Sequence, residues 1–136
     1  MEYTENKMNK LILALLFVST TSLADDHTVF PKGVVLTTDK AKLCVSGYSA
    51  TIRPPVAYTN KLKKQWVPAG HNPNEYELDH YIPIALGGDP KNPDNLWLQK
   101  WDDARRKDVQ ETLQHRDMCK GIYTPQEAQQ HIRDWK

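Results

Sequence analysis

The stretch "ELDHYIPIALGG" (Glu77–Gly88) decides how this chain is expected to fold. It begins as a strand, but Pro83 cannot donate a hydrogen bond in a ladder, so the strand passes there into an irregular segment. The two glycines at its end and the following "DPKNPDN" predict an open loop. A second short strand, "NLWLQ" (Asn95–Gln99), then completes a hairpin with a long connection.

Two helices are expected after the hairpin. The first covers about residues 102–118 and has Asp102 and Asp103 near its start, where negative charge suits the helix dipole. The second begins at "TPQE" (Thr124–Glu127), which is a capping box with proline at the first helical position. These elements predict a small single α+β domain with a hairpin, a helix and a C-terminal helix.

Upstream of the hairpin the pattern is less regular. The spacing in "YTNKLKKQWV" predicts a short helix over about residues 60–66. β-Branched and aromatic residues surround Gly47, and Pro54 and Pro55 must end or border any strand formed there. Residues 25–39 show little periodicity and are expected to form a loose leader before a domain at residues 40–136.

The first 24 residues are typical of an export signal. Lys7 and Lys10 precede the apolar run "LILALLFV" (Leu11–Val18), and "SLA" (Ser22–Ala24) is a small-x-small cleavage pattern. The run is shorter than the ~20 apolar residues that a membrane span needs, so no stable membrane insertion is expected. We therefore expect a secreted or periplasmic protein, cleaved near Ala24.

The net charge limits how the chain could bind nucleic acid, and the two cysteines predict a disulfide. The formal net charge is +1, so any affinity for nucleic acid must come from local patches such as "KLKK" (Lys61–Lys64) and "ARRK" (Ala104–Lys107). Cys44 and Cys119 would meet an oxidising compartment after export, which predicts a disulfide between them. A cysteine metal site would need more thiols or a CxxC pair.

Asp79 and His80 are the residues best suited to chemistry. Hydrolysis of a phosphodiester needs a deprotonated water and a cation near the leaving oxygen. Histidine suits the first task and a carboxylate that binds a divalent ion suits the second. Adjacent residues on a regular strand point to opposite faces, so we expect a distorted strand that lets the two converge. The amide of Asn95 can brace this segment by bonding to backbone across the loop.

Several separated motifs resemble a small exported branch of the HNH-type endonuclease family. They are "YELDHYIPIALGG", "NLWLQ", "ARRKDVQETL", "MCKG" and "EAQQHIRDW", and the similarity spans Leu43–Trp135. The resemblance implies a ββα-metal core, with a divalent cation between the hairpin and the helix. It also implies that His80 is the general base, Asp79 a metal ligand and Asn95 the middle asparagine of the signature.

The helix departs from the family pattern. The family places a histidine or asparagine ligand about nine residues after the middle asparagine, but Ala104 stands there, beside Arg105. Asp103 and Asp108 are the preferred substitutes, and His115 ranks below them. Carboxylate ligands favour Mg²⁺ or Mn²⁺, with Zn²⁺ as the alternative.

The expected function is an exported, metal-dependent endonuclease with low sequence specificity. We expect a monomer that acts on nucleic acid, DNA rather than RNA, through phosphate contacts from Arg105, Arg106 and Lys107. An immunity protein as partner cannot be read from one chain. The competing hypothesis, favoured by Ala104, is a catalytically inactive module of the same fold that binds nucleic acid or the cell envelope.

Overall fold

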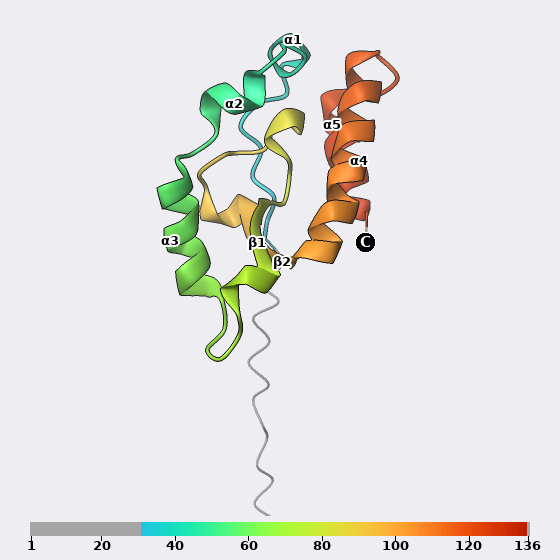
Figure 1. Cartoon of the computed structure of the whole chain (residues 1–136). Helices are drawn as coiled ribbons and strands as arrows, with labels where there is room; N and C mark the ends of the chain where they lie inside the picture. Colours follow the sequence, from blue (N-terminus) through green and yellow to red (C-terminus); the bar gives the residue numbers. More distant parts are fainter. Residues whose placement is uncertain (1–30, 136) are drawn as a thin grey trace, which may run out of the picture.

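An antiparallel hairpin forms the centre of residues 31–135, the part of the chain that the computed structural model describes (Figure 1). Its strands are β1 (Tyr76–His80) and β2 (Leu96–Lys100). Helix α3 (Val56–Trp66) lies on one side of the hairpin, and α4 (Trp101–Cys119) and α5 (Pro125–Asp134) lie on the other. The predicted α+β class, with a hairpin followed by two helices, is confirmed at this level.

Shorter elements connect these parts. They are the helices α1 (Lys40–Leu43) and α2 (Tyr48–Ile52) and the 3-10 turns η1 (Pro73–Glu75), η2 (Ile84–Leu86) and η3 (Pro93–Asn95). The segment from 40 to 52 thus forms two short helices joined by a turn, and not a strand as its β-branched residues suggested. The cause is local, because the Asp39 side chain accepts a hydrogen bond from Ala41 N and caps α1. Helix α3 also begins earlier than predicted, directly after Pro55.

The glycine pair is required by close backbone approach. Gly87 has φ 95°, and a Cβ there would lie 2.0 Å from Thr37 O. A Cβ at Gly88 would lie 1.8 Å from Ile82 O and 2.8 Å from Asn95 Nδ2. Only glycine therefore allows the chain at 87–88 to lie this close both to Thr37 and to Ile82 in the segment that follows β1.

Residues 33–37 are not the loose leader that the sequence predicted. Leu36 N and Thr37 N both donate to Gly87 O, and Val35 forms an isolated bridge with Gly88. Backbone pairing with the long loop holds this segment in place, although its own side chains show no periodicity. The predicted export signal and residues 25–30 of the leader lie outside the described residues.

The hydrophobic core lies between the irregular segment after β1 and the helices α1, α4 and α5. Its buried members are Leu43, Ile82, Leu86, Met118, Ala128 and Ile132. The predicted capping box is present, because Thr124 Oγ1 accepts from Glu127 N while Glu127 Oε2 accepts from Thr124 N. It fixes the start of α5, which covers this core.

The predicted disulfide between Cys44 and Cys119 is confirmed. It joins the end of α1 to the end of α4, and such a bond is consistent with an extracellular location. None of the helices within residues 31–135 has the length and apolarity that a bilayer crossing requires.

Candidate functional site

His80 ends β1 and is held in one orientation by the long loop. The residue is 6% exposed, and its Nε2 lies 2.9 Å from Pro90 O. A carbonyl oxygen only accepts hydrogen bonds, so Nε2 carries the proton. Nδ1 makes no hydrogen bond within the described part of the chain and is the basic nitrogen of the neutral ring.

The surroundings of His80 favour that neutral ring. Burial lowers the pKa of His80 below its ordinary value and outweighs the Pro90 carbonyl and Asp79, which act in the opposite direction. The nearby charges of Arg53 and Lys107 lower this pKa further. Since the ordinary value is about 6.5, the ring is neutral at pH 7 and can accept a proton at Nδ1.

Asn95 makes the bracing contacts that its sequence position predicts. The side chain is fully buried; Oδ1 accepts from Ile82 N at 2.9 Å and Nδ2 donates to Ile82 O at 3.0 Å. Nδ2 also donates to Asp89 O at 2.9 Å. One amide therefore joins the segment after His80 to the loop that holds the His80 ring. Asn95 positions His80 through backbone contacts.

Asp79 points away from the His80 ring, contrary to the expected convergence. β1 stays in register with β2 through His80, so the two side chains leave the strand on opposite faces. The carboxylate Oδ2 accepts from Lys107 Nζ of α4 at 2.7 Å, and its Oδ1 accepts from His80 N at 2.8 Å. Lys107 Nζ also donates to His80 O at 2.7 Å. An ammonium group thus links the end of β1 to α4.

The other predicted metal ligands do not join Asp79. Asp103 is exposed and accepts a hydrogen bond from Arg106, and Asp108 is also exposed. Ala104, at the expected ligand position, is fully buried. Among residues 31–135, no group of three histidine, cysteine or acidic ligand atoms within 4.8 Å of one another includes Asp79.

Two further carboxyl groups lie in the electrostatic environment of Lys107. Burial, followed by the charge of Asp79, raises the pKa of Glu77 above its ordinary value. Burial raises the pKa of Glu111 to about 7, although the charge of Lys107 opposes this. Asp79 and Asp108 also raise the pKa of Glu111, whereas Arg53 lowers it. Near neutrality Glu111 is therefore partly protonated and able to exchange a proton.

The raised pKa of Glu111 predicts a pH-dependent stability. Between pH 4.5 and about 7 the unfolded chain ionises this group while the folded chain keeps it protonated. The stability contributed by Glu111 is therefore present below pH 4.5 and is lost as the pH rises to about 7. The wild type should therefore lose stability relative to Glu111→Gln as the pH rises across this window.

Urea denaturation at several pH values measures that difference. Glu75→Gln, which changes an exposed glutamate of η1, is the matched control and should show a much smaller change across the same window. A Glu111→Gln difference that is flat with pH would contradict the assignment.

The predicted nucleic-acid contacts separate into two environments. Arg105 and Arg106 are exposed on the first turns of α4 and pair with Asp102 and Asp103. They line an open surface depression with Lys100, Asp102, Asp103 and Val109. Lys107 is 1% exposed, so the prediction that it contacts phosphates is wrong. Its helical position three residues after the buried Ala104 turns it toward the hairpin.

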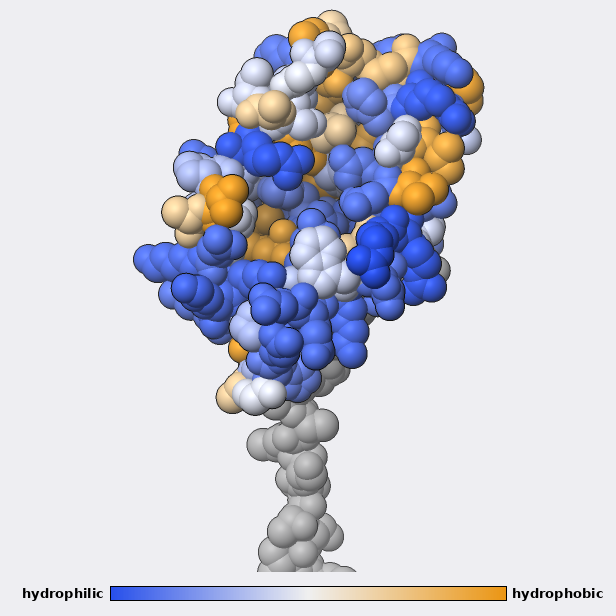
Figure 2. Space-filling view, viewed as in Figure 1, coloured by the Kyte–Doolittle hydropathy of each residue, from blue (hydrophilic) through white to orange (hydrophobic). Residues whose placement is uncertain are grey.

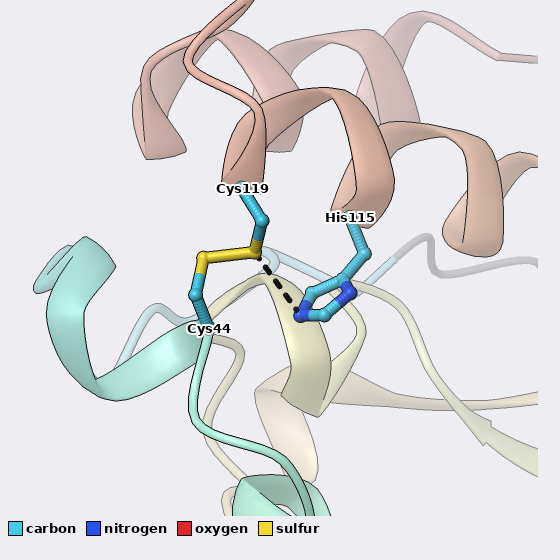
Figure 3. Close-up of side chains that lie close together, drawn as sticks. All are labelled: Cys44, His115 and Cys119. Atoms are coloured by element: carbon cyan, nitrogen blue, oxygen red, sulfur yellow. Dashed lines mark hydrogen bonds between the residues drawn. A yellow bond between two sulfur atoms is a disulfide. The ribbon is translucent and has the colours of Figure 1, made fainter.

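A Cys-His-Cys group lies at the other end of α4 (Figure 3). Ligand atoms of Cys44, His115 and Cys119 lie within 4.8 Å of one another, close enough to hold a metal ion. Both sulfur atoms form the disulfide, however, and the thiolate is the metal-binding form of cysteine. His115 Nε2 lies 2.9 Å from Leu43 O. This group could therefore bind a metal through its thiolates only after reduction. His115 lies in this group and is not a metal ligand beside Asp79.

The roles of Lys107 and Glu111 were missed from the sequence. The sequence assigned Lys107 to phosphate contact and gave Glu111 no role, although their spacing of one turn predicts that they are neighbours on the helix. The available signal was the spacing of Lys107 from Ala104, which places both on one helix face.

Comparison of the chain with protein-family models, curated proteins and solved structures finds no match.

Proposed function

We propose that this chain is an exported endonuclease that hydrolyses phosphodiester bonds of DNA or RNA, with His80 as the general base. The observation that carries the proposal is the bond from His80 Nε2 to Pro90 O, which leaves Nδ1 as the proton acceptor. The order of strand, strand and helix agrees with the HNH-type ββα core that the motifs resemble. Export agrees with the disulfide.

The reaction assigned to His80 is a general-base hydrolysis. Nδ1 removes a proton from a water molecule, whose oxygen attacks the phosphorus. The bond to the leaving oxygen breaks with its electron pair, and that oxygen takes up a proton. In RNA the 2′-hydroxyl is a second nucleophile that the same base could activate.

The divalent metal implied by the resemblance does not fit the residues around Asp79. Both carboxylate oxygens already accept hydrogen bonds, from His80 N and from Lys107 Nζ. A hard cation bound to Oδ2 at its usual distance of roughly 2.0–2.6 Å would crowd the ammonium group at 2.7 Å from that oxygen. Mg²⁺ or Mn²⁺ is therefore given no step in the proposed reaction.

Substrate binding is assigned to exposed cations near the hairpin. Arg53 is exposed and its charge acts on both His80 and Glu111, while Arg105 and Arg106 lie on the first turns of α4. Figure 2 shows a largely hydrophilic face on which apolar residues form small separate patches. Phosphate contacts from these arginines would give low sequence specificity.

A binding module without catalysis is the second candidate. The ion pair between Lys107 and Asp79 favours it, because the carboxylate that would hold a catalytic metal is neutralised by the protein itself. Such a module would bind nucleic acid through the same exposed cations and would leave it intact.

Cleavage of supercoiled plasmid and of labelled RNA by the oxidised protein tests the proposal. We expect cleavage, and we expect His80→Ala to lower its rate by about 10²-fold or more, the usual contribution of a general base. Added imidazole should restore part of the rate, which a merely structural defect would not allow.

His71→Ala is the matched control, because this exposed histidine precedes the hairpin and its ring bonds to Tyr76 and not to the residues around His80. It should cleave at the wild-type rate. Binding without cleavage on every substrate would instead support the second candidate. A wild-type rate in His80→Ala would remove His80 from the reaction.

A further inference from the structure

We propose that the ammonium group of Lys107 is the resident cation of this site, in the place where the resemblance implies a divalent metal. Lys107 Nζ lies between the hairpin and α4, and donates to Asp79 Oδ2 and to His80 O, each at 2.7 Å. Its side chain is 2% exposed, so this charge is a built-in part of the domain. The consequence for catalysis rests on the function proposed above.

Acidic groups lie around Lys107 and balance its charge. Asp79 is in direct contact, and the carboxyl groups of Glu77 and Glu111 interact with it electrostatically from β1 and from the next turn of α4. The backbone carbonyl of His80 supplies a further acceptor for the Lys107 ammonium group at 2.7 Å. Nothing else of positive charge is needed to neutralise Asp79.

The ammonium performs the positioning task of a metal at this place. A metal between hairpin and helix would fix the end of the strand against the helix. Lys107 makes that connection through the carboxylate before His80 and through the carbonyl of His80 itself. Lys107 is therefore a positioning residue that holds the backbone of His80, and it does not contact substrate.

The absence of a helix ligand at Ala104 agrees with the pairing of Lys107 and Asp79. Ala104 is fully buried and offers no ligand, and its small side chain lies one turn before Lys107 on the inward face of α4. With no ligand from the helix, a divalent cation would have the Asp79 carboxylate alone as its protein ligand here, and Lys107 already pairs with that carboxylate. The alanine without a ligand atom and the buried lysine thus lie on the same face of α4 and belong to one arrangement.

Mn²⁺ is the probe that tests this proposal, because it broadens the NMR signals of nuclei close to it. In the wild type we expect no saturable broadening at the His80 ring or at the Asp79 backbone. In Lys107→Met we expect weak broadening to appear there, since Asp79 loses its partner. Lys64→Met, which changes an exposed lysine of α3, should behave as the wild type.

The outcomes separate this proposal from the proposed function. Cleavage that is unchanged by EDTA, together with no Mn²⁺ broadening at Asp79, supports both. Absence of any cleavage, again without broadening, removes the function and supports the inference. Broadening at Asp79 in the wild type that disappears in Asp79→Asn would overturn the inference even if Lys107→Met failed to fold. Cleavage that requires Mg²⁺ would also overturn its catalytic consequence.

Discussion

Replacing Lys107 by methionine is expected to lower the unfolding free energy by about 3–5 kcal/mol, the usual cost of removing one partner from a buried ion pair. Methionine keeps most of the apolar stem, so the loss comes mainly from the charge. Asp79, which is 14% exposed at its side chain, would keep a carboxylate with no cationic partner. The His80 carbonyl would lose its donor at the same time.

Urea denaturation at pH 7 measures this loss. The matched control is Lys64→Met on α3, where an exposed lysine should change stability by no more than about 0.5 kcal/mol. The double variant Lys107→Met with Asp79→Asn should be more stable than Lys107→Met alone, because the uncompensated charge is then removed. A single variant as stable as the wild type would mean that the ion pair does not hold the hairpin against α4.

Local signals in the sequence predicted most of the elements. Pro83 placed the end of the first strand, and the Thr124 capping box placed the start of α5. The cysteines pair as predicted, because a count of two leaves one arrangement within the chain. These features depend on neighbours in sequence or on simple chemistry, so they are visible without a structure.

Features that depend on tertiary contacts were not visible. Residues 33–37 are ordered by backbone bonds to Gly87 and to the loop after it, and nothing in their own side chains signals this. The regular pairing of β1 through His80 likewise depends on β2, and it sends Asp79 toward α4. The sequence therefore singled out Asp79, His80 and Asn95 but not the contact of Asp79 with Lys107.

Lys107 shows why the charge of a residue misleads without its environment. In "ARRK" the three cations look equivalent, yet Arg105 and Arg106 are exposed while Lys107 is buried. The difference is one of helical phase, which carries Lys107 to the face of Ala104. The same phase brings Glu111 into the environment of Lys107, where burial raises its pKa to about 7.

Removing the disulfide with Cys44→Ser and Cys119→Ser together is expected to lower the unfolding free energy by about 4 kcal/mol on the chain-entropy model. The bond spans 75 residues, so its loss frees a long loop in the unfolded chain. It also joins α1 to α4 beside the core residues Leu43 and Met118. A domain this small has a small core, so a loss of packing there has a large effect on its stability.

Urea denaturation of the oxidised wild type and of the double variant measures the effect. Reduction of the wild type with dithiothreitol should reproduce most of it, whereas the double variant should not respond to the reductant. Agreement between the two treatments would assign the loss to the covalent link. A loss of less than about 1 kcal/mol would instead mean that the unfolded chain already keeps α1 close to α4, so that the disulfide removes little entropy from it.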